Sequence, residues 1–317
     1  MIPRDAIREA AARIAGRVHR TPVLSARRLG ERAGARLWLK AECFQKTGSF
    51  KARGALNKVL SLSDAERARG LVTVSAGNHA AAVAWAAREA GCGAVVVMPA
   101  DAPVSKIDAV RGYGAEIVFH DDRPTLFDRL HAVREARGLT FVHPFDDPVV
   151  LAGAGTAGLE IIEDLEAEVV VVPVGGGGLL GGVASAVKQA RPAARIIAVE
   201  LEAGPGLGPA LAAGKPVPSP RPATVADGMT PPFVGALAVE IAREAVDAIV
   251  TVTEEEIRDA MRMLATRAKL YVEGAGAAAT AALLAGKVAL AKGTTVVALV
   301  SGGNVDLATF AAVAANR

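Results

Sequence analysis

The chain has 317 residues, enough for one large or two ordinary domains; 51% of them are apolar and only 4% aromatic. The net charge of +3 comes from dispersed residues, which excludes a concentrated nucleic-acid-binding stripe, and two cysteines are too few for a disulfide framework. Since no apolar run reaches about eighteen residues and the amino terminus lacks a signal-peptide core, we expect a cytoplasmic protein with no membrane or nucleic-acid partner.

Helix and strand patterns alternate along the chain, which is typical of parallel sheets covered by helices. In the first half, the patterns predict helices over residues 5–18, 50–60, 80–89, 105–113 and 126–137, and strands over residues 37–40, 71–75, 94–98, 116–119 and 140–143. Gly138 is a plausible C-cap for the last of these helices.

The second half continues the alternation. It predicts strands over residues 169–174, 195–200, 249–252 and 295–300, and helices over residues 155–165 and 254–267. Thr253 is a good N-cap for the later helix, and the Gly/Pro-rich segment 204–232 is predicted to be a long ordered loop. Loops repeatedly follow the carboxyl ends of strands, where open α/β sheets bind their ligands.

Four glycines, Gly175–Gly178, follow a predicted strand and open a helix. Backbone N–H groups and the helix dipole in such a loop bind phosphate. Gly176, Gly178 and Gly181 also satisfy the dinucleotide pattern G-x-G-x-x-G, and Glu200 ends the next strand, where a ribose-binding carboxylate would lie. This loop alone therefore leaves an NAD-binding oxidoreductase open.

Three further loops carry reactive or polar groups. Lys51 stands at the start of a helix, which lowers the proton affinity of an amine and favours attack on a carbonyl. Ser75-Ala-Gly-Asn-His79 and Ser301-Gly-Gly-Asn304 each follow a strand. A nicotinamide enzyme leaves Lys51, Asn78 and Ser301 without a shared purpose. A cofactor with one phosphate, an aldehyde and a ring nitrogen uses all four loops, and that cofactor is pyridoxal 5′-phosphate.

The chain resembles the fold-type II (tryptophan synthase β-like) pyridoxal-phosphate enzymes, within them the threonine/serine dehydratase (threonine ammonia-lyase) and serine racemase branch. The motifs that carry the resemblance are Lys40-Ala-Glu-Cys-Phe-Gln-Lys-Thr-Gly-Ser-Phe-Lys51, Ser75–His79, Phe145-Asp-Asp-Pro148 with Ala152-Gly-Ala-Gly-Thr156, Pro173–Gly178 and Ser301-Gly-Gly-Asn-Val-Asp306. The resemblance implies an α/β fold with two open, twisted, mostly parallel sheets flanked by helices. It also implies a large cofactor-binding domain (1–70 and 145–317), a small mobile domain (71–144), and a homodimer or dimer of dimers.

The resemblance also assigns roles. Lys51 carries the cofactor covalently and moves the α-proton of the substrate. The other residues implied to bind the cofactor are Phe50 and Asn78 at the ring face and phenolic oxygen, Gly175, Gly176, Gly177, Gly178 and Leu179 at the phosphate, Glu273 near the phenolic side, and Ser301 at the ring nitrogen. The residues implied to bind the substrate carboxylate are Ser75, Ala76, Gly77, Asn78 and His79.

The implied reaction is dehydrative deamination, by β-elimination, of a β-hydroxy amino acid such as L-threonine or L-serine to a 2-oxo acid and ammonia. A hydroxyl at Ser301 cannot keep the ring nitrogen protonated as a carboxylate would, which favours elimination. Ala76 stands where racemases place a second serine, so racemisation of serine or aspartate is the weaker alternative, beside dehydration of 3-hydroxyaspartate or 3-phenylserine. Gly206 replaces an acidic ligand of the metal-dependent members, so no metal is predicted.

Overall fold

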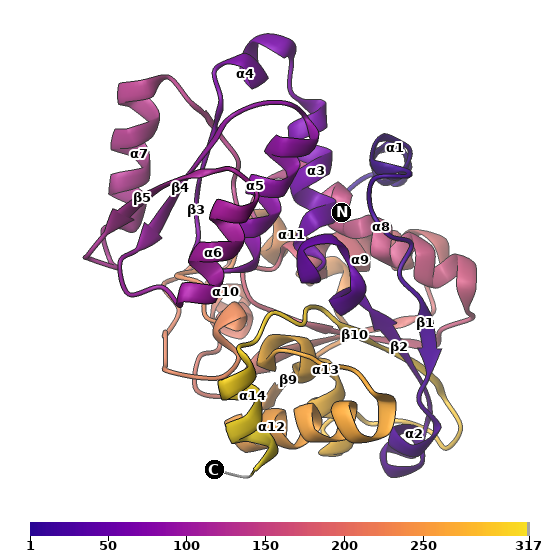
Figure 1. The fold of residues 1–317 in the computed structure, drawn as a ribbon. Helices are drawn as coiled ribbons and strands as arrows, with labels where there is room; N and C mark the ends of the chain where they lie inside the picture. Colours follow the sequence, from indigo (N-terminus) through magenta and orange to yellow (C-terminus); the bar gives the residue numbers. More distant parts are fainter. Residues whose placement is uncertain (316–317) are drawn as a thin grey trace.

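Two β-sheets organise residues 1–315, the part of the chain that this computed structural model describes (Figure 1). The larger sheet is parallel except for its edge strand β1, which pairs with β2 in the antiparallel sense. In spatial order its strands are β1 (Val23–Ser25), β2 (Arg36–Ala41), β10 (Thr295–Val300), β7 (Val169–Pro173), β8 (Arg195–Leu201) and β9 (Ala248–Val252). Every residue of β7 and β10 is buried, as expected of parallel strands covered on both faces.

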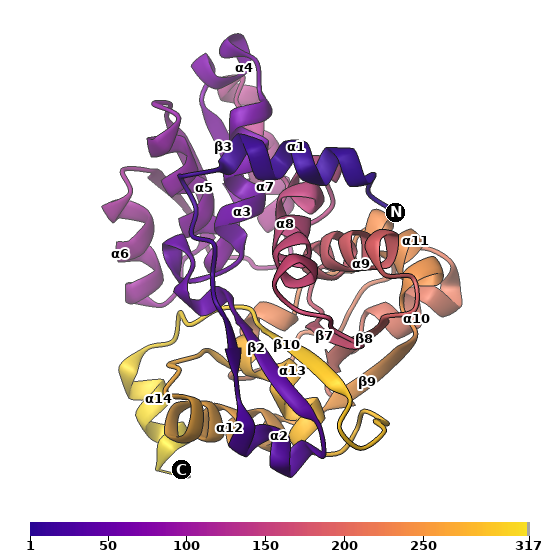
Figure 2. The ribbon, with the colours of Figure 1, turned by 90° about the vertical axis from the view of Figure 1, so that its right-hand side faces the viewer.

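Helices cover both faces of the large sheet, and they separate into two layers in Figure 2. One layer contains α1 (Arg4–Ile14), α8 (Pro148–Asp164), α9 (Gly178–Ala190), α10 (Leu207–Ala213) and α11 (Ala236–Ala245). The other layer contains α2 (Arg27–Ala33), α12 (Glu254–Met263), α13 (Gly274–Leu284) and α14 (Leu307–Ala314). No helix among the described residues is both long enough and apolar enough to cross a membrane.

The smaller sheet is parallel throughout. Its strands, in spatial order, are β5 (Glu116–His120), β4 (Ala94–Pro99), β3 (Leu71–Val74) and β6 (Thr140–Phe141). One face packs against α3 (Lys51–Ser61), α5 (Asn78–Glu89) and α6 (Val104–Gly112), and the other against α7 (Leu126–Arg137). The short α4 (Asp64–Ala68) leads into β3. The predicted pair of mostly parallel sheets flanked by helices is therefore confirmed.

Several predicted elements differ from the structure: the helix predicted over 5–18 ends at Ile14, and the strand predicted over 140–143 ends at Phe141. The helix predicted over 155–165 begins at Pro148, because the Asp147 side chain accepts hydrogen bonds from the backbone N–H groups of the first turn and proline suits the first helical position. The segment 204–232, predicted to be a loop, contains α10 and the short 3-10 helix η3 (Asp227–Met229). The helix predicted over 254–267 leaves α-helical geometry after Met263 and continues as a π-helical turn.

Local capping explains where α12 begins. The Thr253 hydroxyl accepts from the Glu256 N–H, and the Glu256 carboxylate accepts from the Thr253 N–H, which forms a complete capping box. The predicted N-cap is therefore confirmed.

Two 3-10 turns, η1 (Glu42–Phe44) and η2 (Lys46–Gly48), then α3, connect the large sheet to the small one.

Candidate active site

A cavity of about 300 Å³ lies between loops that follow strands of both sheets. All of the predicted site residues line it: Phe50, Lys51, Ser75, Ala76, Gly77, Asn78, His79, Gly175, Gly176, Gly177, Gly178, Leu179, Glu273 and Ser301. The structure thus brings together four loops that are far apart in the sequence. A concave site with a few convergent polar groups is typical of small-molecule binding.

Lys51 is the first residue of α3. Its Nζ atom donates a hydrogen bond to the carbonyl oxygen of Pro144 at 2.7 Å and lies 5.2 Å from the centre of the Phe50 ring. Burial lowers the pKa of the Lys51 amine to about 8, because desolvation disfavours its charged form. An appreciable fraction of this amine is therefore neutral near pH 8 and able to attack an aldehyde.

Asn78 and Glu273 lie in a chain of hydrogen bonds at one side of the cavity. The Asn78 amide donates from Nδ2 to Glu273 Oε1 at 2.7 Å, and Asn304 Nδ2 donates to Asn78 Oδ1 at 2.8 Å. Burial, reinforced by the negative charge of Asp227, raises the pKa of Glu273 to about 7. Glu273 is only 5% exposed, so it is not a solvated carboxylate at a helix start.

The glycine run connects β7 to α9. Gly177 has a left-handed φ of 86°, which favours glycine, and a Cβ atom at Gly176 would lie 2.2 Å from the Phe145 ring. No side chain caps α9, so the N–H groups of its first turn have no partner within the helix. N–H groups arranged in this way can bind a phosphate group, and a side chain at Gly176 would clash with Phe145.

The Ser75–His79 loop lies at the start of α5, another helix without a capping side chain. The Ser75 hydroxyl accepts a hydrogen bond from the Gly77 N–H at 3.1 Å. His79 Nε2 lies 3.2 Å from the Val142 carbonyl oxygen, and burial, with the charge of Lys51, lowers the pKa of His79 well below its ordinary value. The imidazole of His79 is therefore predominantly neutral at neutral pH.

Ser301 directly follows β10 and lines the cavity. Its Oγ atom makes a long hydrogen bond of 3.3 Å to the Ala275 carbonyl oxygen and is buried. The Ser301 carbonyl oxygen accepts from the Phe50 N–H at 3.0 Å, which ties the Lys51 turn to the end of the large sheet. The residue at this position is a serine and not an acidic residue.

Sequence analysis did not assign several other residues of the cavity wall, among them Lys106, Arg123, Arg221 and Asp227. Lys106 forms an ion pair with Asp227, which joins α6 on the small sheet to η3 beside the large one. Arg123 and Arg221 come from irregular loops and Asp227 from the short η3, and the side-chain positions of such segments follow no periodic pattern that a sequence could show.

Glu200 does not fit a dinucleotide site. Its carboxylate is buried and accepts the N–H groups of Gly206, Leu207 and Gly208 at 2.6, 2.6 and 3.0 Å. These bonds cap α10 and leave the carboxylate facing a helix terminus instead of a ribose. The dinucleotide interpretation of the glycine run thus loses its second residue.

The family model described as "Pyridoxal-phosphate dependent enzyme" matches residues 14–302. The chain belongs to this family. The L-threonine ammonia-lyase of Thermotoga maritima is 45% identical over 312 residues, which cover 97% of this chain and 77% of that protein. Among solved structures, a threonine deaminase from T.th. has a TM-score of 0.90, with 44% identity over 96% of this chain and 98% of that one. Maize serine racemase has a TM-score of 0.92, with 41% identity over 96% of this chain and 94% of that one.

Membership of the family confirms the predicted cofactor, pyridoxal 5′-phosphate, and the predicted fold-type II architecture. It also overturns the NAD-binding alternative. The residues of this pyridoxal-phosphate dependent enzyme fit the cofactor, because a partly neutral lysine and an open phosphate cradle face the same cavity. The roles of the individual side chains stay predictions.

Proposed function

We propose that this enzyme catalyses the dehydrative deamination of a β-hydroxy amino acid, with L-threonine and L-serine as substrates. The observation that carries the proposal is the partly buried Lys51 amine, which lines the same cavity as the glycine run and the Ser75–His79 loop. The names of the similar Thermotoga maritima and T.th. proteins support the same reaction class. The products are 2-oxobutanoate from threonine or pyruvate from serine, and ammonia.

Each cofactor contact can be assigned to a residue of the cavity. With pyridoxal phosphate bound, Lys51 would hold the aldehyde covalently, Phe50 would pack against the ring, and Asn78 would donate to the phenolic oxygen, with Glu273 on the same side of the cavity. The N–H groups of Gly175–Gly178 and Leu179 would hold the phosphate, and Ser301 would hydrogen-bond the ring nitrogen. When bound, pyridoxal phosphate withdraws electrons from the substrate and so weakens its Cα–H bond.

The protein groups then act on the substrate. The free N–H groups at the start of α5, together with Ser75 and Asn78, bind the substrate carboxylate. The Lys51 amine accepts the proton from Cα, and the β-hydroxyl takes up one proton and leaves as water, so that the two proton transfers cancel over one turnover. Hydrolysis of the released enamine consumes one water and gives the 2-oxo acid and ammonia, so atoms and charge balance.

Ala76 favours elimination over racemisation. Ala76 lines the cavity between Ser75 and Gly77, and its methyl group has no proton to donate. Racemisation needs a donor on the face of the substrate carbanion opposite to the Lys51 amine. The side chain at this position of the chain does not provide one.

Three broader assignments rest on the resemblance to the family. We propose a homodimer, or a dimer of dimers, that works in the cytoplasm. We also propose that residues 71–144 form a small domain that closes over the substrate. Light scattering of the purified protein measures the first of these directly.

The test is the visible spectrum of purified protein, recorded with keto acid release after addition of L-threonine or L-serine. The proposal expects a cofactor absorption band that is lost in Lys51→Ala, together with keto acid release at least about a thousandfold slower than in wild type. The control is Lys215→Ala, which removes an exposed lysine outside the cavity. This variant is expected to keep the absorption band and the wild-type rate of keto acid release.

Two other outcomes would contradict the proposal. A cofactor band without keto acid from either amino acid rejects these substrates, and 3-hydroxyaspartate and 3-phenylserine are then assayed. A band and turnover that survive in Lys51→Ala reject the assignment of the catalytic amine.

A further inference from the structure

Helix α3, which carries Lys51, begins under unfavourable local conditions. Its N-cap position is Phe50, which offers no capping side chain, and its first turn contains no acidic residue. Two cations, Lys51 and Arg53, instead occupy that turn, where the helix dipole disfavours positive charge. The preceding turn holds Thr47 at a φ of 61°, an uncommon conformation for a residue other than glycine. Local preference alone would therefore let this turn fray.

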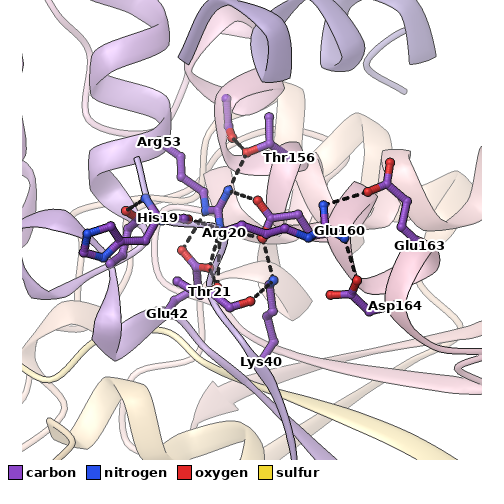
Figure 3. A network of polar contacts seen from close by, with 12 residues as sticks. His19, Arg20, Thr21, Lys40, Glu42, Arg53, Thr156, Glu160, Glu163 and Asp164 are labelled. Atoms are coloured by element: carbon purple, nitrogen blue, oxygen red, sulfur yellow. Dashed lines mark hydrogen bonds and ion pairs between the residues drawn. The ribbon is translucent and has the colours of Figure 1, made fainter. Parts of the chain in front are cut away.

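Arg53 compensates for these defects through a buried network of polar contacts (Figure 3). The guanidinium is fully buried. It pairs with Glu42 through Nε and Nη2, both at 2.8 Å, and with Glu160 through Nη1 and Nη2 at 2.7 and 2.8 Å. Nη1 also donates to the Thr156 hydroxyl at 3.1 Å. Two bidentate pairs fix both the position and the orientation of this planar group.

The network is closed and electrically balanced. Lys40, also fully buried, pairs with Glu160 and donates to the Thr21 carbonyl oxygen at 2.7 Å, and the Thr21 hydroxyl donates to Glu42. Two cations thus face two carboxylates. Although burial opposes ionisation, the Arg53 guanidinium keeps the pKa of Glu42 below its ordinary value. Removal of one partner would leave a buried charge without compensation.

The network lies away from the cavity. Two residues along an α-helix correspond to a rotation of about 200°, so Lys51 and Arg53 point to opposite sides of α3. Lys51 lines the cavity, whereas Arg53 lies against η1 and α8. On the α8 side the two backbones are in close contact, because a Cβ atom at Gly153 would lie 2.7 Å from the Gly54 Cα. The first turn of α3 is therefore held on the side that faces away from the cavity.

We propose that Arg53 is a positioning residue for Lys51, and that the buried Arg53–Glu42–Glu160–Lys40 network holds the first turn of α3 so that the Lys51 amine faces the cavity. This inference rests on the proposed function of Lys51. The role that we propose is positional, since Arg53 and Lys51 lie on opposite sides of α3 and burial is the cause of the lowered pKa of Lys51.

Arg53→Lys tests the proposal, because lysine keeps the charge and loses both bidentate pairs. In the holoenzyme we expect kcat for L-threonine to fall roughly 10- to 100-fold, with KM changed less than about threefold and the pH of half-maximal kcat unchanged. We also expect at least about tenfold faster deuterium exchange of the amides of residues 52–56 and a weaker circular dichroism of the bound cofactor. The control is Ile257→Ala, a buried residue of α12 on the other side of the large sheet.

The proposal is overturned if Arg53→Lys lowers the melting temperature as Ile257→Ala does, while kcat and exchange at residues 52–56 stay at the wild-type values. If Arg53→Lys does not fold, Thr156→Val removes one acceptor of the guanidinium and must show the same changes at smaller size. A wild-type kcat and exchange pattern in Thr156→Val then overturns the proposal. Turnover that survives in Lys51→Ala rejects the proposed function instead, whatever the exchange at α3.

Discussion

Glu273 is a carboxyl group placed where ionisation is unfavourable. It is buried at the start of α13, receives one side-chain hydrogen bond from Asn78, and lies within the field of Asp227. Burial is the main reason that its pKa is raised to about 7. The residue therefore links folding stability to pH in a range where ordinary carboxylates do not titrate.

The direction in which stability changes with pH follows from the number of protons that each state binds. Between about pH 4.5 and 7 the folded state holds a proton on Glu273 that the unfolded state has lost, so stability falls as pH rises through this range. Glu273→Gln removes the effect. We expect the free energy of unfolding of the cofactor-free variant, relative to wild type, to increase by about 2 kcal/mol between about pH 5 and 8. Urea unfolding at both pH values measures the free energy of unfolding of each protein. The same change with pH in wild type and Glu273→Gln would contradict the assignment of the raised pKa to Glu273.

At the scale of single residues, sequence analysis located the groups that follow strands. Lys51, Asn78 and Ser301 could be found because the first two begin helices and the third directly follows a strand, and all three line one cavity. The pairing of Arg53 with Glu160 could not be found, because 107 residues separate them and only the packing of α3 on α8 brings them together.

At the scale of elements, the turn between β7 and α9 depends on glycine for two separate reasons. Gly177 combines a left-handed φ of 86° with a close neighbour, since a Cβ atom there would lie 2.3 Å from the Cβ of Ala238. Gly286 has a similar φ of 68° but no atom within 4 Å of its hypothetical Cβ. Alanine substitutions at the two positions therefore separate the free-energy cost of a left-handed φ from the free-energy cost of a steric clash.

We expect Gly177→Ala to lower the free energy of unfolding by about 1–3 kcal/mol more than Gly286→Ala, because only the former must move α11 to fit a methyl group. The displaced turn also weakens the phosphate cradle, so the dissociation constant for pyridoxal phosphate should rise at least about tenfold in Gly177→Ala alone. Denaturant unfolding and absorbance titration measure the two effects. Equal affinities in both variants would remove the glycine run from the cofactor site.

Element boundaries were predicted well where one chemical signal dominated and poorly where signals conflicted. Thr253 with Glu256 marks the start of α12 without ambiguity. The helix predicted for α8 began too late because Gly153 lowers helix propensity, although this glycine permits close contact with α3. Tertiary packing stabilises a helix there that propensity alone would end.

At the scale of the whole molecule, the cavity lies between two sheets, and the Lys106–Asp227 ion pair joins them at its wall. Lys106 comes from α6 and is largely covered, whereas the Asp227 side chain is 59% exposed. An ion pair with one exposed partner contributes at most about 1 kcal/mol and weakens as salt rises. If residues 71–144 move as a unit, this contact favours the closed arrangement by that amount.

The contribution of the Lys106–Asp227 ion pair can be tested by removing the positive charge of Lys106. Lys106→Gln should raise KM for the amino acid about two- to fivefold with kcat nearly unchanged, because a less populated closed state lowers apparent affinity without altering the Lys51 amine. Raising ionic strength should increase KM of the wild type but not of the variant. Asp101→Asn is the matched control, since it breaks an ion pair with Arg123 that joins two loops of the small sheet. The same KM and salt response in Lys106→Gln as in wild type would mean that the two sheets keep their separation without this contact.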